Sequence, residues 1–363
     1  MKLLKNTLSS INGRDEEEVK SAWKRIDNLT KPIGSLGELE EISAKVAGIR
    51  GNFPDKIKKK NIVIMCSDNG VWEEGIGSCN QDLTVSVTNN FTRGITGVCI
   101  LSDFYGSDRT VVDIGIKVDM DNPQVINRKI NYGTRNMAKE AAMTREEAVR
   151  AIEVGIEMVD QLAEKGYDLL GTGEMGVCNT ATSSAVLSVL SGISPNIVVG
   201  RGSGITDEQL SRKLEAVKRA IDINKPDPDD VIDVLSKVGG FDICGLCGCF
   251  LGAAKNRIPI VIDGLISSVA ALCAARLKSC ARDFMFPSHL SAEPGAGYVM
   301  KELGLTPMLN LNMRLGEGSG CPLAFSIIEA SIYAMNNMVD FEDSRIDRGQ
   351  LVDIREKKGG CNL

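Results

Sequence analysis

Histidine is almost absent from this chain of 363 residues, and His289 is the only one. A serine-type catalytic triad would have to use it, yet the sequence has no G-x-S-x-G elbow for the nucleophile. A loop histidine that fixes its own neighbours is the favoured interpretation, although a place at a strand end would let it touch a ligand. Acid–base chemistry therefore falls to carboxylates.

Long basic tracts and long apolar runs are also lacking. The net charge is -6, and no tract could neutralise many phosphates, so nucleic acid is not favoured as a partner. No window holds the roughly 18 uncharged apolar residues of a membrane span, and the first segment, MKLLKNTLSS, is too short and polar for a secretory signal. These features predict a soluble, cytoplasmic protein.

Cysteine, in contrast, is plentiful. The eleven cysteines are odd in number and scattered among apolar neighbours, which suits a reducing cytosol better than a disulfide framework. The spacing of Cys244, Cys247 and Cys249 resembles part of a metal or iron–sulfur site. No His and no clear fourth Cys follow nearby, so we favour a tightly packed helix in which Cys acts as a slightly larger Ala.

Short apolar runs alternate with helical patterns along the chain. Most runs are continuous in Val, Ile and Leu, as in a parallel sheet covered on both faces. The predicted strands are 61–70, 109–116, 167–174, 195–202, 258–265, 283–290 and, less regularly, 307–318. Capping boxes at Thr144 with Glu147 and at Thr206 with Gln209 predict helices between them. The alternation predicts a doubly wound α/β fold, a Rossmann-like parallel sheet flanked by helices.

The two ends of the chain differ from this middle part. Residues 14–50 have a helical pattern in which Ser35 and Glu38 are expected to cap a helix, and residues 322–341 resemble one long apolar helix. We therefore predict a large α/β substrate-binding domain over 58–318. Residues 1–57 together with 319–363 are predicted to form a small helical domain built from both termini.

Glycines cluster after several predicted strands, at 171–176, 200–204, 295–297 and 316–318. Ligands of a parallel sheet bind beyond the carboxyl ends of its strands, where glycine lets backbone N–H groups approach a phosphate. The first cluster spells G-x-G-x-x-G, but no Asp or Glu occurs between Met175 and Thr206 to hold a ribose. A dinucleotide site is therefore disfavoured, and so is an oxidoreductase. No G-x-x-x-x-G-K-[ST] motif indicates a nucleoside triphosphatase.

Three carboxylates and one lysine stand at the predicted ligand edge. Glu317, between two glycines, is the best-framed acid, and Asp263 and Glu174 also lie at strand ends. Lys213 is the nearest obvious cation, although composition alone would favour an exposed helix lysine there.

Seven segments together resemble one enzyme family, in order along nearly the whole chain: TKPIGSLGELEEIS, GEMGVCNTATSSA, VVGRGSGITDEQLSRK, GGFDICGLCG, IDGLISSVAAL, SHLSAEPGA and MRLGEGSG. The family is that of the nicotinate-nucleotide–dimethylbenzimidazole phosphoribosyltransferases, which assemble the lower ligand of cobalamin. The resemblance implies transfer of a 5-phosphoribosyl group from nicotinate mononucleotide to a benzimidazole-type base. It also implies a homodimer that needs no metal or other cofactor.

The resemblance further assigns roles to residues. Glu317 is implied as the general base that takes the N–H proton of the incoming base, and its flanking glycines are expected to let the planar base and the ribose approach it. Glu174, Lys213 and Asp263 are implied to hold water or polar groups of the substrates, and Ser291 and the motif glycines to bind phosphate. The full set of implied substrate-binding residues is Gln81, Glu174, Met175, Gly176, Thr180, Gly202, Ser203, Gly204, Lys213, Asp263, Ser291, Leu315 and Gly316.

One region departs from the family pattern. Family members commonly carry DHG followed by a segment such as EGVSAYPQEVT, whereas residues 68–84 here are DNGVWEEGIGSCNQDLT. Asn69 replaces His, Cys79 and Asn80 replace a Tyr-Pro pair, and Gln81 is kept. We expect a wider or softer base pocket that accepts other benzimidazoles, purines or phenolics. A non-catalytic nucleotide-binding protein of the same fold is the alternative, which the intact Glu317 motif disfavours.

Overall fold

The computed structural model describes residues 2–347, 349 and 351–355. Clustering of the backbone divides the chain into two compact units, one of residues 1–12 and 58–324 and the other of 13–57 and 325–363. This division differs from the predicted one at both ends. The first helix, α1 (Lys2–Ser10), belongs to the larger unit because it packs on helices α6 and α11. The second boundary falls inside helix α14 (Cys321–Asn337), after Ala324.

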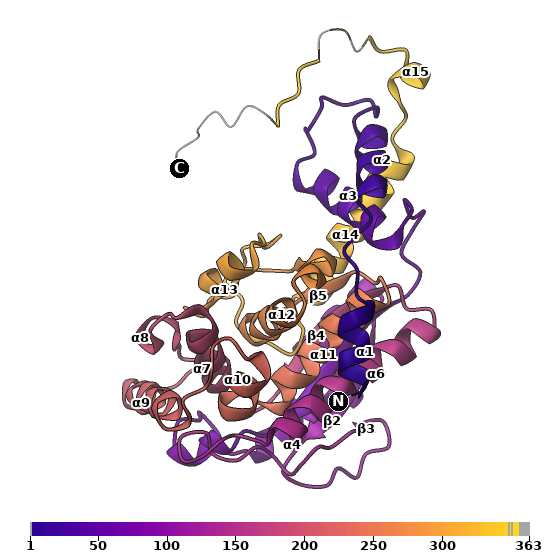
Figure 1. Ribbon diagram of the computed structural model, residues 1–363. Coiled ribbons are helices and arrows are strands. Elements are labelled where there is room, and N and C mark those ends of the chain that lie inside the picture. Colours follow the sequence, from indigo (N-terminus) through magenta and orange to yellow (C-terminus); the bar gives the residue numbers. More distant parts are fainter. Residues whose placement is uncertain (1, 348, 350, 356–363) are drawn as a thin grey trace. The chain divides into compact units, whose positions relative to one another are not determined.

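The larger unit is built on one parallel sheet of six strands in the order β3-β2-β1-β4-β5-β6 (Figure 1). The α/β class and the parallel sheet flanked by helices are confirmed. The strands are β1 (Lys60–Ser67), β2 (Asp108–Gly115), β3 (Ile126–Asn127), β4 (Leu169–Met175), β5 (Ile260–Ile262) and β6 (Met285–Pro287). All residues of β5 and β6 and nearly all of β1 are buried, which explains their continuous apolar runs.

Two predicted strands are wrong. Residues 195–202 instead begin with the short helix α8 (Pro195–Val198), because the Ser194 side chain caps it and Pro195 occupies its first turn. Residues 307–318 form no strand; they run beside the end of β6, where Met308 donates to the Pro287 carbonyl and Leu309 forms an isolated parallel bridge with His289. The two-residue strand β3 was not predicted, because so short a segment carries no periodic signal.

Two helices of the larger unit begin at the predicted capping boxes. Both boxes form, at the starts of α6 (Arg145–Glu164) and α9 (Asp207–Asn224). The remaining elements of this unit are η1 (Gly70–Glu74), α4 (Asp82–Thr92), α5 (Gly97–Tyr105), α7 (Asn179–Ser191), α10 (Val231–Val238), α11 (Phe241–Lys255), α12 (Leu265–Leu277), η2 (Ser279–Phe284) and α13 (Ala296–Leu303). Helices α4 and α11 each pack on β1, β2 and β4, and α12 packs on β4 and β5.

Helix α11 carries the three clustered cysteines. Cys244, Cys247 and Cys249 are completely buried, and burial raises the pKa of each thiol. This agrees with the packed small-residue helix. Among the described residues, no group of three or more His, Cys, Asp or Glu is arranged to hold a metal ion. None of the helices in the described part of the chain has the length and apolarity needed to cross a membrane.

The small residues of α11 allow helix α6 to approach very closely. A Cβ atom on Gly155 would lie 1.9 Å from the carbonyl oxygen of Gly245, and one on Gly248 would lie 1.9 Å from that of Ile152. Gly155→Ala is therefore expected to lower the free energy of unfolding by about 1–3 kcal/mol despite the better helix propensity of Ala. Urea unfolding measures this. Gly297→Ala on α13 is the matched control, because no heavy atom lies within 4 Å of its Cβ position, and equal losses in the two variants would contradict the prediction.

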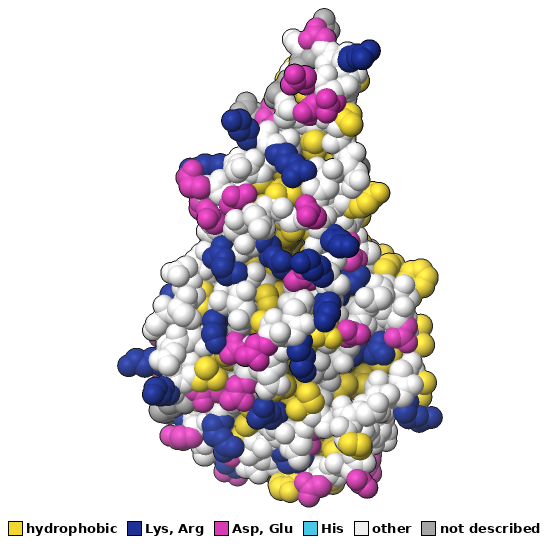
Figure 2. Space-filling view, turned by 90° about the vertical axis from the view of Figure 1, so that its right-hand side faces the viewer, with side chains coloured by type: hydrophobic (Ala, Val, Ile, Leu, Met, Phe, Trp, Pro, Cys, Tyr) yellow, Lys and Arg dark blue, Asp and Glu magenta, His cyan; other side chains and the backbone are white. Residues whose placement is uncertain are grey.

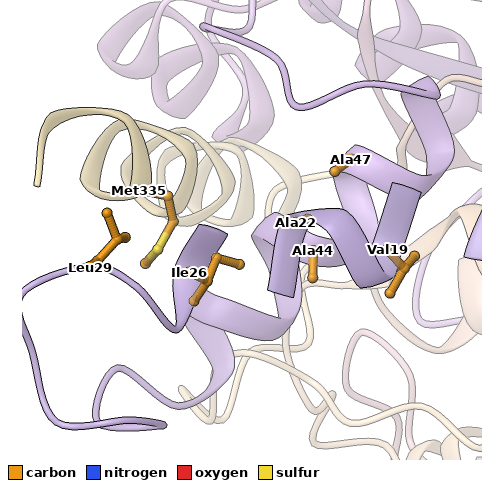
Figure 3. Close-up of a cluster of buried hydrophobic side chains, with 7 residues drawn as sticks. All are labelled: Val19, Ala22, Ile26, Leu29, Ala44, Ala47 and Met335. Carbon is orange, nitrogen blue, oxygen red and sulfur yellow. The ribbon is translucent and has the colours of Figure 1, made fainter. Parts of the chain in front are cut away.

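The smaller unit contains α2 (Glu16–Ile26), α3 (Glu38–Arg50), most of α14 and α15 (Phe341–Ser344). Its core consists of small and aliphatic side chains, drawn in Figure 3: Val19, Ala22, Ile26, Leu29, Ala44, Ala47 and Met335. The predicted cap at Ser35 is wrong, since α3 begins after Gly37, whose φ is 53°, and has no side-chain cap. A buried ion pair of Lys31 with Glu40, 2.8 Å long, holds the chain at the start of this helix instead.

Acidic and basic side chains are intermingled on the molecular face shown in Figure 2.

Candidate active site

A cavity of about 220 Å³ lies in the larger unit, where the loops that follow the strands converge. The residues after β1 contribute Ile76 and Cys79, the end of β4 contributes Glu174, and the residues after β6 contribute His289. The site therefore lies beyond the carboxyl ends of neighbouring parallel strands, where ligands of such sheets bind.

Most of the residues implied as site residues line this cavity. They are Glu174, Met175, Gly176, Thr180, Gly202, Ser203, Lys213, Ser291, Leu315, Gly316 and Glu317. Gln81, Gly204 and Asp263 are not among the lining residues. Cys178, Asn179 and Glu293 also line the cavity, and sequence reasoning missed them. Their positions inside the quoted motifs were the only available signal.

The Glu317 carboxylate is half-buried at the start of helix α5. Its Oε2 atom accepts a hydrogen bond of 3.2 Å from the backbone N–H of Val98, the second residue of that helix. Burial raises the pKa of Glu317, while the N–H groups of Val98 and Gly97 and the Thr96 side chain act in the opposite direction. The helix start thus favours the ionised carboxylate that a general base requires, because the unpaired N–H groups there attract negative charge.

The glycines beside Glu317 allow the backbone to adopt a left-handed conformation. Gly316, Glu317 and Gly318 have φ values of 80°, 65° and 95°, a left-handed run that glycine adopts without steric cost. A Cβ on Gly316 would lie 2.5 Å from Glu174 Oε1, and one on Gly318 would lie 2.8 Å from Ile62 Cγ2. Protein atoms thus occupy the space where these Cβ atoms would lie, and of the two glycines Gly316 also lines the cavity.

Most of the G-x-G-x-x-G segment lies inside strand β4, and only its last glycine, Gly176, follows the strand and lines the cavity. Gly171 and Gly173 lie inside the strand, and a Cβ on Gly173 would lie 2.2 Å from the carbonyl oxygen of Glu317. Gly173 therefore lets the turn of residues 316–320, called the Glu317 turn below, approach the sheet. Gly295 and Gly297, in another glycine cluster, do not line the cavity and belong to the start of α13.

Asp263 holds the Glu317 turn through hydrogen bonds to its backbone. Its two carboxylate oxygens accept the N–H groups of Gly318 and Gly320, at 3.1 and 2.7 Å. The side chain is buried, and burial raises its pKa to about 7. Asp263 thus positions the turn that carries Glu317. His289 is buried beside it, with Nδ1 2.9 Å from Ser288 Oγ, and burial lowers its pKa, so the ring is neutral near pH 7.

Lys213 also lines the cavity and is not an exposed helix lysine. Its side chain is buried, and Nζ donates to Thr180 Oγ1 at 2.8 Å and to the Gly200 carbonyl at 2.9 Å. Burial lowers its pKa, and the nearby Glu293 carboxylate opposes that shift. Glu293 accepts the N–H of Gly202 at 3.0 Å. This wall therefore holds a desolvated cation behind a glycine loop, which suits an anionic group of a ligand.

The divergent segment 68–84 is divided between cavity and core. Cys79 faces the cavity, whereas the amide of Asn80 contacts Asp82 at 3.1 Å. Gln81 is buried, donates to the Asn69 carbonyl at 3.1 Å and accepts from Lys117 at 3.3 Å. Gln81 therefore shapes the segment from behind.

Comparisons with known proteins agree with this geometry. A phosphoribosyltransferase family model matches residues 11–346. The nicotinate-nucleotide–dimethylbenzimidazole phosphoribosyltransferase of Clostridium tetani is 58% identical over 98% of this chain and 99% of its own. That of Ruminiclostridium cellulolyticum is 56% identical over 94% and 97%. The crystal structure of the Thermus thermophilus enzyme of the same name has a TM-score of 0.87 at 34% identity and covers 92% of this chain and 100% of its own.

The fold and the site thus define a phosphoribosyltransferase. The chain belongs to the nicotinate-nucleotide–dimethylbenzimidazole phosphoribosyltransferase family, as the identities and coverage establish.

Proposed function

We propose that this enzyme transfers the 5-phosphoribosyl group of nicotinate mononucleotide to a ring nitrogen of 5,6-dimethylbenzimidazole or a related base. The products are nicotinate and an α-ribazole 5′-phosphate, for the nucleotide loop of cobalamin. The observation that carries the proposal is the Glu317 carboxylate, held at the start of α5 and facing the cavity.

The chemistry needs one base and no strong acid. The bond from C1′ to the pyridinium nitrogen breaks, and its electron pair neutralises the ring as nicotinate leaves. The incoming ring nitrogen donates its lone pair to C1′, and the N–H proton on its other nitrogen becomes acidic. Glu317 takes that proton, a contribution of about 10²–10⁴-fold to the rate. A binding-only protein of this fold would not need the acid.

The phosphate and ribose are proposed to be held by Lys213, Thr180, Ser291 and the loop of residues 202–204. The space between the ribose and the base is proposed to be lined by Glu174, Met175, Gly176, Leu315 and Gly316. Gln81 and Asp263 support these walls from outside the cavity. The homodimer stays a prediction from the resemblance, and the cytoplasmic location stays a prediction from the composition.

The enzyme is proposed to accept several lower-ligand bases, because Cys79 puts a small side chain on the cavity wall. Incubation with nicotinate mononucleotide and an equimolar mixture of benzimidazoles, purines and phenolics should give several ribosylated products by mass. Cys79→Tyr should narrow this range, because an aromatic ring would fill part of the wall. Asn80→Tyr is the matched control, since Asn80 is directed to Asp82. Exclusive use of 5,6-dimethylbenzimidazole by the unmodified enzyme would remove this proposal, and absence of any ribosylated base would remove the proposed transfer.

A further inference from the structure

Two buried carboxyl groups, one in the cavity wall and one outside it, share one amide donor. Asn179, the first residue of α7, contacts Glu174 Oε2 through its Nδ2 atom and Asp242 Oδ2 at 3.1 Å through the same atom. Glu174 is only 7% exposed, and Asp242, in the first turn of α11, is 0% exposed. The two hydrogens of one amide nitrogen can serve two acceptors, so Asn179 fixes both carboxyl groups at once.

The network continues to the turn that carries the proposed base. Glu174 Oε1 accepts a hydrogen bond of 3.3 Å from the backbone N–H of Glu317. Glu317 has a φ of 65°, a conformation that residues other than glycine rarely adopt and that its surroundings must hold. Contacts therefore run without a gap from the start of α11 through α7 and β4 to residue 317.

We propose that Asn179 and Asp242 are positioning residues for the transfer: they hold the Glu174 carboxyl group against the Glu317 backbone and so fix where the Glu317 carboxylate stands. The inference rests on the proposed function, because it concerns the placement of the general base. Neither residue needs to touch the reacting atoms. Asp242 does not line the cavity, and Asn179 acts from its edge.

Several charged groups face Glu174 from the surrounding elements. Asp242 lies on α11, Asp263 follows β5, and the Glu317 backbone N–H comes from the turn after residue 315. The charge of Asp68, after β1, raises the pKa of Asp242. Burial and then Asp242 raise the pKa of Glu174 to about 8, whereas the Asn179 hydrogen bond and the Glu317 N–H lower it.

The ionised carboxylate is the stronger acceptor for the Glu317 N–H, so activity should rise as Glu174 ionises. Removing the charge of Asp242 lowers the pKa of Glu174 and moves the acid limb of the kcat–pH profile to lower pH. Removing the Asn179 donor raises that pKa and moves the limb to higher pH.

The test compares Asp242→Asn and Asn179→Ser with the unmodified enzyme, measuring nicotinate release across pH. Each variant should lose about 10- to 100-fold in kcat, as expected for a small misplacement of a catalytic group. The KM of Asp242→Asn should stay unchanged, because Asp242 lies outside the cavity. The acid limb should move to lower pH in Asp242→Asn and to higher pH in Asn179→Ser. Because the two predicted shifts differ in direction, each variant tests the inference by itself.

Asp160→Asn is the matched control. Asp160, on α6, contacts Lys255 and Asn256 at the other end of α11, so its kcat and pH profile should match those of the unmodified enzyme. Acid limbs that stay in place, or move together, would overturn the inference and leave the two residues a purely structural role. An unmodified enzyme that releases no nicotinate would instead overturn the proposed function, and the positioning inference with it.

Discussion

Glu317→Gln is expected to lower kcat by about 10²–10⁴-fold while nicotinate mononucleotide still binds. The amide oxygen of Gln can still accept the N–H of Val98, so the turn should keep its shape, but the amide cannot take a proton. Turnover by mass analysis of the ribosylated base, with calorimetric titration of nicotinate mononucleotide, separates chemistry from binding.

The pH dependence gives the same variant a second signature. Burial raises the pKa of both Glu317 and Glu174, so kcat of the unmodified enzyme should rise with pH as the base ionises and as Glu174, which holds it in place, ionises. Glu317→Gln should lose this dependence. Glu302→Gln, which removes a surface ion pair with Arg276, is the matched control. Unchanged turnover in Glu317→Gln would remove the assignment of the base.

Lys213→Met is expected to raise the KM for nicotinate mononucleotide by about 10- to 100-fold, with a smaller effect on kcat. A charge-assisted hydrogen bond to an anionic ligand contributes about 1.5–3 kcal/mol, and 1.4 kcal/mol corresponds to a tenfold change. Two of the donors of Nζ serve Thr180 and Gly200, which leaves the third for the ligand. Initial rates at varied nicotinate mononucleotide measure the effect.

Lys218→Met provides the control for Lys213, because it lies on the same helix and forms a surface pair with Glu215. It should leave the KM unchanged. Thermal unfolding of both variants distinguishes a binding role from a structural one. A lower melting temperature of Lys213→Met with an unchanged KM would show that the buried ammonium only ties Thr180 to Gly200.

The sequence predicted the fold where its signals are local. Both capping boxes formed, since a side chain and a backbone group three residues apart meet within one helical turn. The buried central strands were visible as continuous apolar runs. Ser194 with Pro195 was also a local signal, but the apolar residues after it favoured a strand, and that prediction was wrong.

The site was predicted less completely, because its contacts join distant segments. The resemblance implied Glu317, yet nothing in the sequence indicated that Gly173 and Gly316 make room for other protein atoms. Asp242 and Asn179 each lie in a motif of the resemblance, but nothing in the sequence indicated that these two motifs meet, because they lie far apart in the chain.

The amino-acid sequence by itself determined that this is an α/β protein, which strands are buried and, through its motifs, the enzyme family. Only the tertiary structure decided what the loop residues do: that Lys213 is buried, that Asp263 holds a turn, and that Glu317 meets the start of α5. Periodicity and capping depend on neighbours a few residues apart, whereas desolvation and hydrogen bonding depend on which distant segments the sheet brings together.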